Sequence, residues 1–413
     1  MNLYLFNAPD SAAIYGIGTY LKELTHALDG NGINVHVVNL HSARTEFEVV
    51  QEENFENWIV PEVFNQNTFN SSMQKLEDYC RNVIYLLRLH IKDTKDLVFH
   101  INYNHYHFFV KELKNAFDCK VVATVHFMKW ALELQGNLAL LKTILSKPGD
   151  QKSTFEEWLS VCFENEQNLY KSADQVIALA QYTKNLLQTE YHIDTNKIAF
   201  IPNGLEDISS LRETDKESLR KKWLISDKEF IILFVGRLDK EKGLIFLLKA
   251  FRQVLEKIPE CRLIIAGSGN YDIYYPECED IWTHVTWTGF MRKRKLYELY
   301  SIADIGIMPS FHEQCSYVAI EMMRHGLPLI GSTSTGLKEM IIDRDTGLHI
   351  PVIEEEEKVE IDSSLLAEKM LYLLQNPTER QQLGQNARRR YEECYSIEVF
   401  RENMYQFYRS LYE

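Results

Sequence analysis

Short apolar runs alternate with helical segments along almost the whole chain, and this alternation restricts the fold more than any other feature. The expected strands of the first half are LYLF, NVHVVNL, LVFHINY, KVVATVHF, QVIALA and KIAFIP. Those of the second half are EFIILFVG, CRLIIAG, VTWTGF, ADIGIMP and LPLIGS. Strands separated by helices form parallel sheets through right-handed crossovers, with helices on both faces. The sequence therefore predicts an α/β protein with doubly wound, Rossmann-like sheets.

The length and a charged connector predict two domains. A chain of 413 residues exceeds one ordinary core, and SSLRETDKESLRKKWLI follows the IPNG of residues 201–204. We expect two lobes hinged near residue 205, with ligands beyond the carboxyl ends of the strands and in a cleft between the lobes. Residues 41–72 are expected to be less regular, and residues 131–152 are expected to form an exposed insertion or a mobile loop.

Composition excludes several classes of protein. The chain has 45 Lys and Arg against 59 Asp and Glu, a net charge of −14, and neither half is basic. This argues against nucleic acid as a partner and against more than weak association with anionic membranes. The start MNLYLFNAP is expected to be a strand, and the apolar run 230–235 is below the ~20 residues of a membrane helix, so we expect a cytoplasmic protein. The seven Cys lack metal-ligand spacing, so reduced thiols are expected.

The loop VGRLDKEKG follows a strand and precedes a helix. It supplies Gly236, Arg237 and Lys242. A guanidinium fork, an ammonium and a helix N-terminus together suit a diphosphate. The alternative interpretation is a solvated charge run on a surface loop.

Two further strand ends could meet a nucleotide. Gly267 in IIAGSGN would let the backbone approach a ligand closely, although a tight turn has the same pattern. Gly289, Phe290 and Met291 follow VTWT, where a base could lie on the backbone and on an apolar side chain. The alternative for Phe290 is a core position.

HEQCSYVAIE places two carboxylates, Glu313 and Glu321, on either side of an expected helix start at Ser316. Ser316 is a candidate N-cap, and Gly326 is a stop signal. Carboxylates accept hydrogen bonds from vicinal diols, so the pair suits a sugar and a ribose flanking a diphosphate. The alternative for Glu321 is a buried structural ion pair.

The ordered set GR-x4-KG, AGxG, TGF, E-x7-E and TGLKEMI-x3-DTG resembles the retaining GT-B glycosyltransferases of family 4, the glycosyl transferases group 1. The resemblance implies an acceptor-binding domain over 1–205, a donor domain over 206–390, and a final helix within 391–413 that returns to the first domain. It also implies metal-independent transfer, with retention, from a UDP- or GDP-sugar to a sugar, lipid-linked or peptide hydroxyl.

The resemblance assigns Arg237 and Lys242 to the diphosphate, Glu321 to the ribose and Glu313 to the transferred sugar. His126 would approach that sugar and Gly16 the β-phosphate. The remaining implied donor-site residues are Gly204, Gly236, Gly267, Gly289, Phe290, Met291, Cys315, Ser316 and Tyr317. The sequence departs from the family at Tyr15-Gly16, at Gln314-Cys315-Ser316 and at Ala180-Gln181, and the second departure bears on sugar selectivity.

Histidines gather in FHINYNHYH, which contains His100, Asn102, His105 and His107. No carboxylate or Cys stands at ligand spacing, so acceptor-site or surface residues are expected rather than a metal centre. His100, Asn102 and His126 are the candidate acceptor residues. A hydrogen-bonded structural role is the alternative for His126.

Two other functions stay open. A UDP-sugar 2-epimerase on the same fold would use the same phosphate clamp, and a non-catalytic nucleotide-sugar-binding protein would need no reacting group. A dinucleotide oxidoreductase is disfavoured because YGIGTY lacks the third glycine of GxGxxG and the second strand ends in Asn39 rather than an acid.

Overall fold

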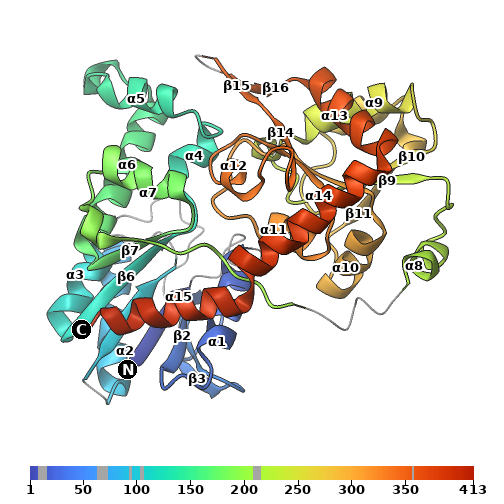
Figure 1. Cartoon of the computed structure of the whole chain (residues 1–413). Helices are drawn as coiled ribbons and strands as arrows, with labels where there is room; N and C mark the ends of the chain where they lie inside the picture. The colour runs from blue at the N-terminus through green and yellow to red at the C-terminus, as the bar shows by residue number, and fades with distance from the viewer. Residues whose placement is uncertain (8–15, 63–72, 93–94, 103–106, 208–214, 356–357) are drawn as a thin grey trace. The chain divides into compact units, whose positions relative to one another are not determined.

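The computed structural model describes residues 1–7, 16–62, 73–92, 95–102, 107–207, 215–355 and 358–413 (Figure 1). The chain divides into two compact units. The N-terminal unit comprises Met1–Lys129, Ile144–Gly204 and Ile397–Glu413, and the C-terminal unit comprises Trp130–Thr143 and Leu205–Ser396. Each unit is built around one extended sheet.

The sheet of the N-terminal unit has the order β3-β4-β2-β1-β5-β6-β7-β8. Its strands are β1 (Asn2–Asn7), β2 (Asn34–Ser42), β3 (Glu48–Gln51), β4 (Glu56–Pro61), β5 (Leu97–Ile101), β6 (Cys119–Val125), β7 (Gln175–Ala178) and β8 (Ile198–Phe200). Neighbouring strands are parallel except β3 and β4, which form an antiparallel edge. This hairpin lies in the stretch that the sequence predicted to be irregular.

The helices of this unit include segments from both ends of the chain. They are α1 (Gly18–Leu28), α2 (Met73–His90), α3 (His107–Ala116), α6 (Thr154–Ser172), α7 (Gln181–Thr189) and α15 (Ile397–Ser410). Figure 1 shows α15, in red, beside α1. The Phe400 ring lies 5.7 Å from that of Tyr20, and the Arg401 guanidinium donates to the Ala27 carbonyl at 3.0 Å. The last helix is thus part of the N-terminal unit.

The C-terminal unit has a six-stranded parallel sheet of order β11-β10-β9-β12-β13-β14. Its strands are β9 (Phe230–Val235), β10 (Cys261–Ala266), β11 (Val285–Gly289), β12 (Ile305–Met308), β13 (Leu329–Ser332) and β14 (Gly347–Ile350), and β15 (Val352–Glu354) pairs separately with β16 (Val359–Ile361). The main helices are α8 (Lys216–Lys222), α9 (Leu244–Leu255), α10 (Lys293–Ile302), α11 (Tyr317–Arg324), α12 (Leu337–Met340), α13 (Ser363–Gln375) and α14 (Pro377–Arg390).

The strand order reverses direction between β9 and β12. From β9 the chain moves outward to β10 and β11, then returns to place β12 on the other side of β9. In open α/β sheets, ligands bind beyond the carboxyl ends of the strands at such a switch point. The strand order therefore predicts a ligand site at the loops that follow β9 and β12.

The prediction of an exposed insertion or mobile loop over 131–152 is wrong for residues 131–145, whereas residues 148–151 are exposed as expected. The segment forms α4 (Lys129–Glu133) and α5 (Leu138–Ser146), and the side chains of Trp130 and Ala131 are fully buried. The Asn137 amide donates to the Glu355 carbonyl at 3.0 Å. The leucines and isoleucine of LALLKTIL supply an apolar helix face, which outweighed the flanking Gly and Pro that suggested a loop.

A buried carboxylate joins three elements of the N-terminal unit. Glu166 on α6 is 5% exposed, and its two oxygens accept hydrogen bonds from the Lys129 backbone N–H and the Tyr191 hydroxyl, each at 2.7 Å. Burial raises the pKa of Glu166 from 4.5 to about 7. The uncharged form of Glu166 is therefore favoured in the folded protein up to near neutral pH.

We predict that Glu166→Gln removes a pH-dependent loss of stability. A carboxyl whose folded pKa exceeds its unfolded pKa contributes stability that is present below about 4.5 and is lost as the pH rises through about 7. The wild type should therefore lose roughly 2 kcal/mol of unfolding free energy across this window relative to Glu166→Gln, measured by urea unfolding between pH 5 and 8. The exposed Glu157 on the same helix provides the matched control, Glu157→Gln. Parallel pH profiles for the wild type and Glu166→Gln would contradict the prediction.

Candidate functional site

Backbone contact joins the loops after β9 and β12. Gly243, at φ 65°, ends the short 3-10 helix Lys240–Lys242 and precedes α9. A Cβ on Gly243 would lie 2.1 Å from the Pro309 carbonyl oxygen. The Phe311 N–H donates to the Glu241 carbonyl at 2.8 Å. The two loops can approach this closely because position 243 has no side chain.

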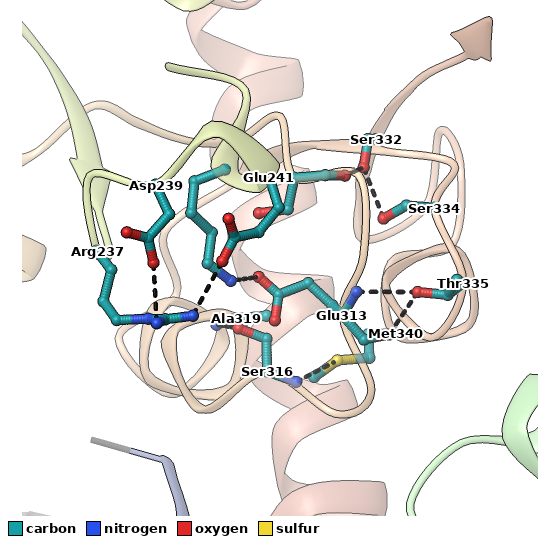
Figure 2. Close-up of polar contacts among 12 residues, drawn as sticks. Arg237, Asp239, Glu241, Glu313, Ser316, Ala319, Ser332, Ser334, Thr335 and Met340 are labelled. Carbon is teal, nitrogen blue, oxygen red and sulfur yellow. Dashed lines mark hydrogen bonds and ion pairs between the residues drawn. The ribbon is translucent and has the colours of Figure 1, made fainter. Parts of the chain in front are cut away.

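Both cationic residues predicted from the sequence, Arg237 and Lys242, lie in the loop after β9, and Figure 2 shows Arg237 with its carboxylate partners. Lys242 Nζ lies 2.7 Å from Glu313 Oε1, and both side chains are largely buried. Arg237 pairs with Asp239 at 2.9 Å and with Glu241 at 3.0 Å. Burial raises the pKa of Glu241, and the neighbouring Lys242 opposes this rise. The structure thus brings Arg237, Lys242 and Glu313 together and adds two carboxylates that were not predicted as site residues.

Glycines continue the site along the ends of β9, β10 and β11. The Gly236 N–H donates to the Ala266 carbonyl and the Gly267 N–H to the Gly289 carbonyl, each at 3.0 Å. A Cβ on Gly267 would lie 1.7 Å from the Gly236 oxygen, so these strand ends pack backbone against backbone. Phe290 is 61% exposed and is therefore not a core residue. Met291 beside it is partly buried.

The backbone of Glu313 is bound by the loop that follows β13. The Glu313 N–H donates to the Thr335 hydroxyl at 2.9 Å, the same hydroxyl donates to the Glu313 carbonyl, and the Gly336 N–H donates to that carbonyl at 2.9 Å. Sequence reasoning quoted Thr335 as the first residue of TGLKEMI but gave it no role. The available signal was its place in STSTG, directly after an expected strand.

Helix α11 starts as predicted. Ser316 is its N-cap and accepts from the Ala319 N–H at 3.5 Å, and Gly326 adopts φ 65° after its end. Cys315 is buried and Tyr317 is partly buried. These residues lie between the two glutamates of the predicted pair.

Glu321 occupies a different environment from Glu313. Its side chain is 1% exposed, it accepts from the Tyr300 hydroxyl at 2.8 Å, and it forms an ion pair with the Lys293 ammonium. Burial lowers the pKa of Lys293, but the neighbouring Glu321 and Tyr297 together raise it by more, so the net pKa is raised. The buried ion pair expected under the structural alternative for Glu321 is present, and half of the Lys293 side chain is exposed at the edge of the pair. The ribose-binding role of Glu321 stays a prediction.

The candidate residues of the N-terminal unit form a polar network at the ends of β5 and β6. His126 Nε2 lies 3.1 Å from Asn102 Oδ1, and burial lowers the pKa of His126 to about 3. His100 is fully buried, with its two ring nitrogens 2.6 Å from the Tyr408 hydroxyl and from Thr124 Oγ1. His100 therefore has no surface to offer an acceptor, which corrects its assignment as an acceptor residue.

The structure also describes other residues of this unit that the sequence singled out. Gly16 is exposed, Gly204 is buried at the end of the unit, and His107 is exposed at the start of α3. Tyr15 and His105 lie outside the described residues. Within the described ranges, no group of three His, Cys, Asp or Glu side chains could hold a metal ion, and no helix is long and apolar enough to cross a membrane.

We predict that Gly243→Ala destabilises the protein by roughly 3 kcal/mol, because the methyl group meets the Pro309 carbonyl and alanine disfavours a positive φ. The matched control is Gly32→Ala, which has φ 73° but no atom within 4 Å of the added Cβ, and it should cost only about 1 kcal/mol. Urea unfolding measures both. Equal losses would show that backbone strain alone, and not the contact between the loops, requires glycine at 243.

Known families and structures match both units. The model of the glycosyl transferases group 1 matches residues 215–390, and the model of glycosyltransferase family 4 matches residues 14–207. An uncharacterized glycosyltransferase of Methanocaldococcus jannaschii is 32% identical over 183 residues, which is 43% of this chain and 46% of that protein. The chain spans about half the length of several curated relatives that it matches.

Solved structures match over the whole chain. Sucrose-phosphate synthase from Thermosynechococcus elongatus has a TM-score of 0.76 at 21% identity and covers 100% of this chain and 99% of its own. Anabaena HepE in complex with UDP-glucose has a TM-score of 0.68 at 15% identity, covering 99% and 100%. The predicted GT-B fold, with two parallel-sheet domains, is confirmed. The two family models, which match residues 14–207 and 215–390, show that the chain belongs to glycosyltransferase family 4, the glycosyl transferases group 1.

Proposed function

We propose that this protein transfers a glycosyl unit from a nucleotide diphosphate-sugar, with UDP or GDP as the nucleotide, to an acceptor hydroxyl with retention of configuration. The observation that carries the proposal is the 2.7 Å pair of Lys242 and Glu313 at the switch point of a parallel sheet. One residue suits a phosphate and the other a sugar hydroxyl, and the sequence places them 71 residues apart.

The leaving diphosphate would be stabilised by charge. Arg237 offers a bidentate guanidinium and Lys242 a compact ammonium, and α9 begins next to both with its N–H groups directed toward the loop. A bound diphosphate would replace Asp239 and Glu241 as the partner of Arg237. It would also replace Glu313 as the partner of Lys242. Preorganised cations that stabilise developing negative charge supply much of the rate enhancement in such sites, and here they would take the place of a divalent metal ion.

The two glutamates would hold the two sugars of the donor. Glu313 is 13% exposed on its side chain and would accept hydrogen bonds from the transferred sugar once Lys242 turns to the phosphate. Glu321, fixed by Tyr300 and Lys293, would accept from the ribose hydroxyls. The Anabaena HepE structures contain UDP, glucose and UDP-glucose, which supports a nucleotide-sugar donor for this chain as part of the proposal.

His126 would contact a sugar hydroxyl as a neutral ring. Because the Asn102 oxygen accepts from Nε2, the proton lies on Nε2 and Nδ1 has a free lone pair. With a pKa of about 3, His126 is uncharged at neutral pH, so it would act as a hydrogen-bond acceptor and not as a cation. No nucleophile is assigned, and the leaving phosphate would help deprotonate the acceptor in a same-face displacement.

We predict that Lys242→Ala weakens UDP or GDP binding and transfer together, by roughly 10- to 100-fold, because a charged partner of the diphosphate is lost. Lys240→Ala, an exposed lysine of the same short helix, is the matched control and should behave as the wild type. Titration calorimetry and donor turnover measure the two effects. Unchanged nucleotide affinity in Lys242→Ala would remove the phosphate clamp from the proposal.

We predict that Glu313→Gln affects sugar transfer but not nucleotide binding. We expect transfer to fall at least tenfold while affinity for free UDP or GDP stays within about twofold, because the carboxylate is assigned to the sugar alone. The opposite order would mean that the roles of Glu313 and Glu321 are interchanged.

A different experiment distinguishes the transferase from a UDP-sugar 2-epimerase on the same fold. Incubation of the wild type with UDP-N-acetylglucosamine without an acceptor would release the epimer only if the protein is an epimerase.

Activity should also be unchanged by EDTA. The cations of the loop after β9 are assigned the charge neutralisation that a divalent ion provides in other transferases. Turnover that disappears in EDTA and returns with Mg²⁺ or Mn²⁺ would contradict this part of the proposal.

A further inference from the structure

The backbone of Glu313 is held from the neighbouring loop by one hydroxyl. Thr335 Oγ1 accepts from the Glu313 N–H at 2.9 Å and donates to the Glu313 carbonyl, so a single side chain binds both polar groups of one peptide residue (Figure 2). The Gly336 N–H adds a third hydrogen bond at 2.9 Å. These bonds fix the point from which the Glu313 side chain extends.

Thr335 has an unfavourable backbone conformation at this position. Its φ is 26°, and among the described non-glycine residues with positive φ it is the one β-branched side chain. β-branched residues avoid this region, and such strain persists where the surrounding contacts enforce it, most often at functional sites. The three hydrogen bonds to Glu313 are contacts of this kind.

The loop that carries Thr335 is itself anchored. The Ser332 hydroxyl is fully buried, bonds to the Ser310 carbonyl and lies 2.9 Å from the Ser334 hydroxyl. The Thr333 N–H donates to the Ile350 carbonyl at 2.8 Å, and the Thr333 hydroxyl accepts from the Val352 N–H at 3.1 Å. The hydrogen bonds from Thr335 and Gly336 to the Glu313 backbone therefore come from a loop that is itself held in place.

The Glu313 carboxylate has a second, different support. Its ion pair with Lys242 holds the carboxylate in the structure, but the proposed function assigns Lys242 to the diphosphate. If Lys242 turns to the phosphate, the hydrogen bonds from Thr335 and Gly336 to the Glu313 backbone remain. These bonds would keep Glu313 in place. We propose that Thr335 is a positioning residue that directs Glu313 toward the transferred sugar; this inference rests on the proposed function.

The test compares three variants of two threonines. Thr335→Val removes the hydroxyl and keeps the shape, Thr335→Ser keeps the hydroxyl, and Thr333→Val removes a hydroxyl of the same loop that bonds away from Glu313. We expect Thr335→Val to lower kcat for a UDP- or GDP-sugar about tenfold while the Kd for free UDP or GDP changes less than twofold. Thr335→Ser should recover most of the rate, and Thr333→Val should match the wild type.

A double-mutant cycle decides whether Thr335 acts through Glu313. In a Glu313→Gln background, Thr335→Val should cause little further loss. The proposal is overturned if the two losses multiply, if Thr335→Ser is as slow as Thr335→Val, or if Thr333→Val is equally slow. Thr335→Gly, which removes strain and hydroxyl together, gives the same readout should the valine variant fail to fold.

Failure of the proposed function gives a distinct result. If the wild type binds neither UDP nor GDP and turns over neither nucleotide-sugar, the proposed function fails and the role of Thr335 fails with it. If the wild type binds and transfers but Thr335→Val equals the wild type, the role of Thr335 alone is rejected.

Discussion

The close approach of the loops after β9 and β12 is the constraint on which the candidate site depends. Gly243 allows the two backbones to touch at Pro309, and this contact brings a lysine from one loop to a glutamate from the other. A side chain at 243 would separate the loops and with them the two charges. The chemistry of the site therefore begins with a position that has no side chain.

Charge in this protein acts locally. The chain carries a net charge of −14, yet Arg237 and Lys242 stand in one loop at the end of a sheet and pair with three carboxylates, those of Asp239, Glu241 and Glu313. Those carboxylates keep two adjacent cations compatible with burial, since an unpaired buried charge is costly. A ligand that binds both cations must replace these carboxylates, so it must carry more than one negative charge. A diphosphate meets that demand better than a single phosphate or a carboxylate.

The sequence predicted the parts of this architecture that depend on local pattern. The alternation of apolar runs and helices predicted both parallel sheets, and Ser316 and Gly326 predicted the limits of α11, because caps are encoded within a few residues. The prediction failed for residues 131–145, since the flanking Gly and Pro masked an apolar helix face. The pairing of Lys242 with Glu313, and of Thr335 with the Glu313 backbone, could not be derived from spacing. Such contacts depend on which strands are neighbours in the sheet and on how tightly their loops pack.

The two glutamates illustrate how one motif can supply two kinds of carboxylate. Glu321 lies inside a helix, and the Tyr300 hydroxyl and the Lys293 ammonium of α10 hold its carboxylate. Glu313 lies in a loop, and its carboxylate pairs with Lys242. A diphosphate would attract that lysine away from Glu313. A fixed carboxylate suits a part of the donor that does not change during the reaction. A carboxylate released when the diphosphate binds suits the sugar that moves, because its hydrogen-bonding capacity becomes available only when the donor is in place.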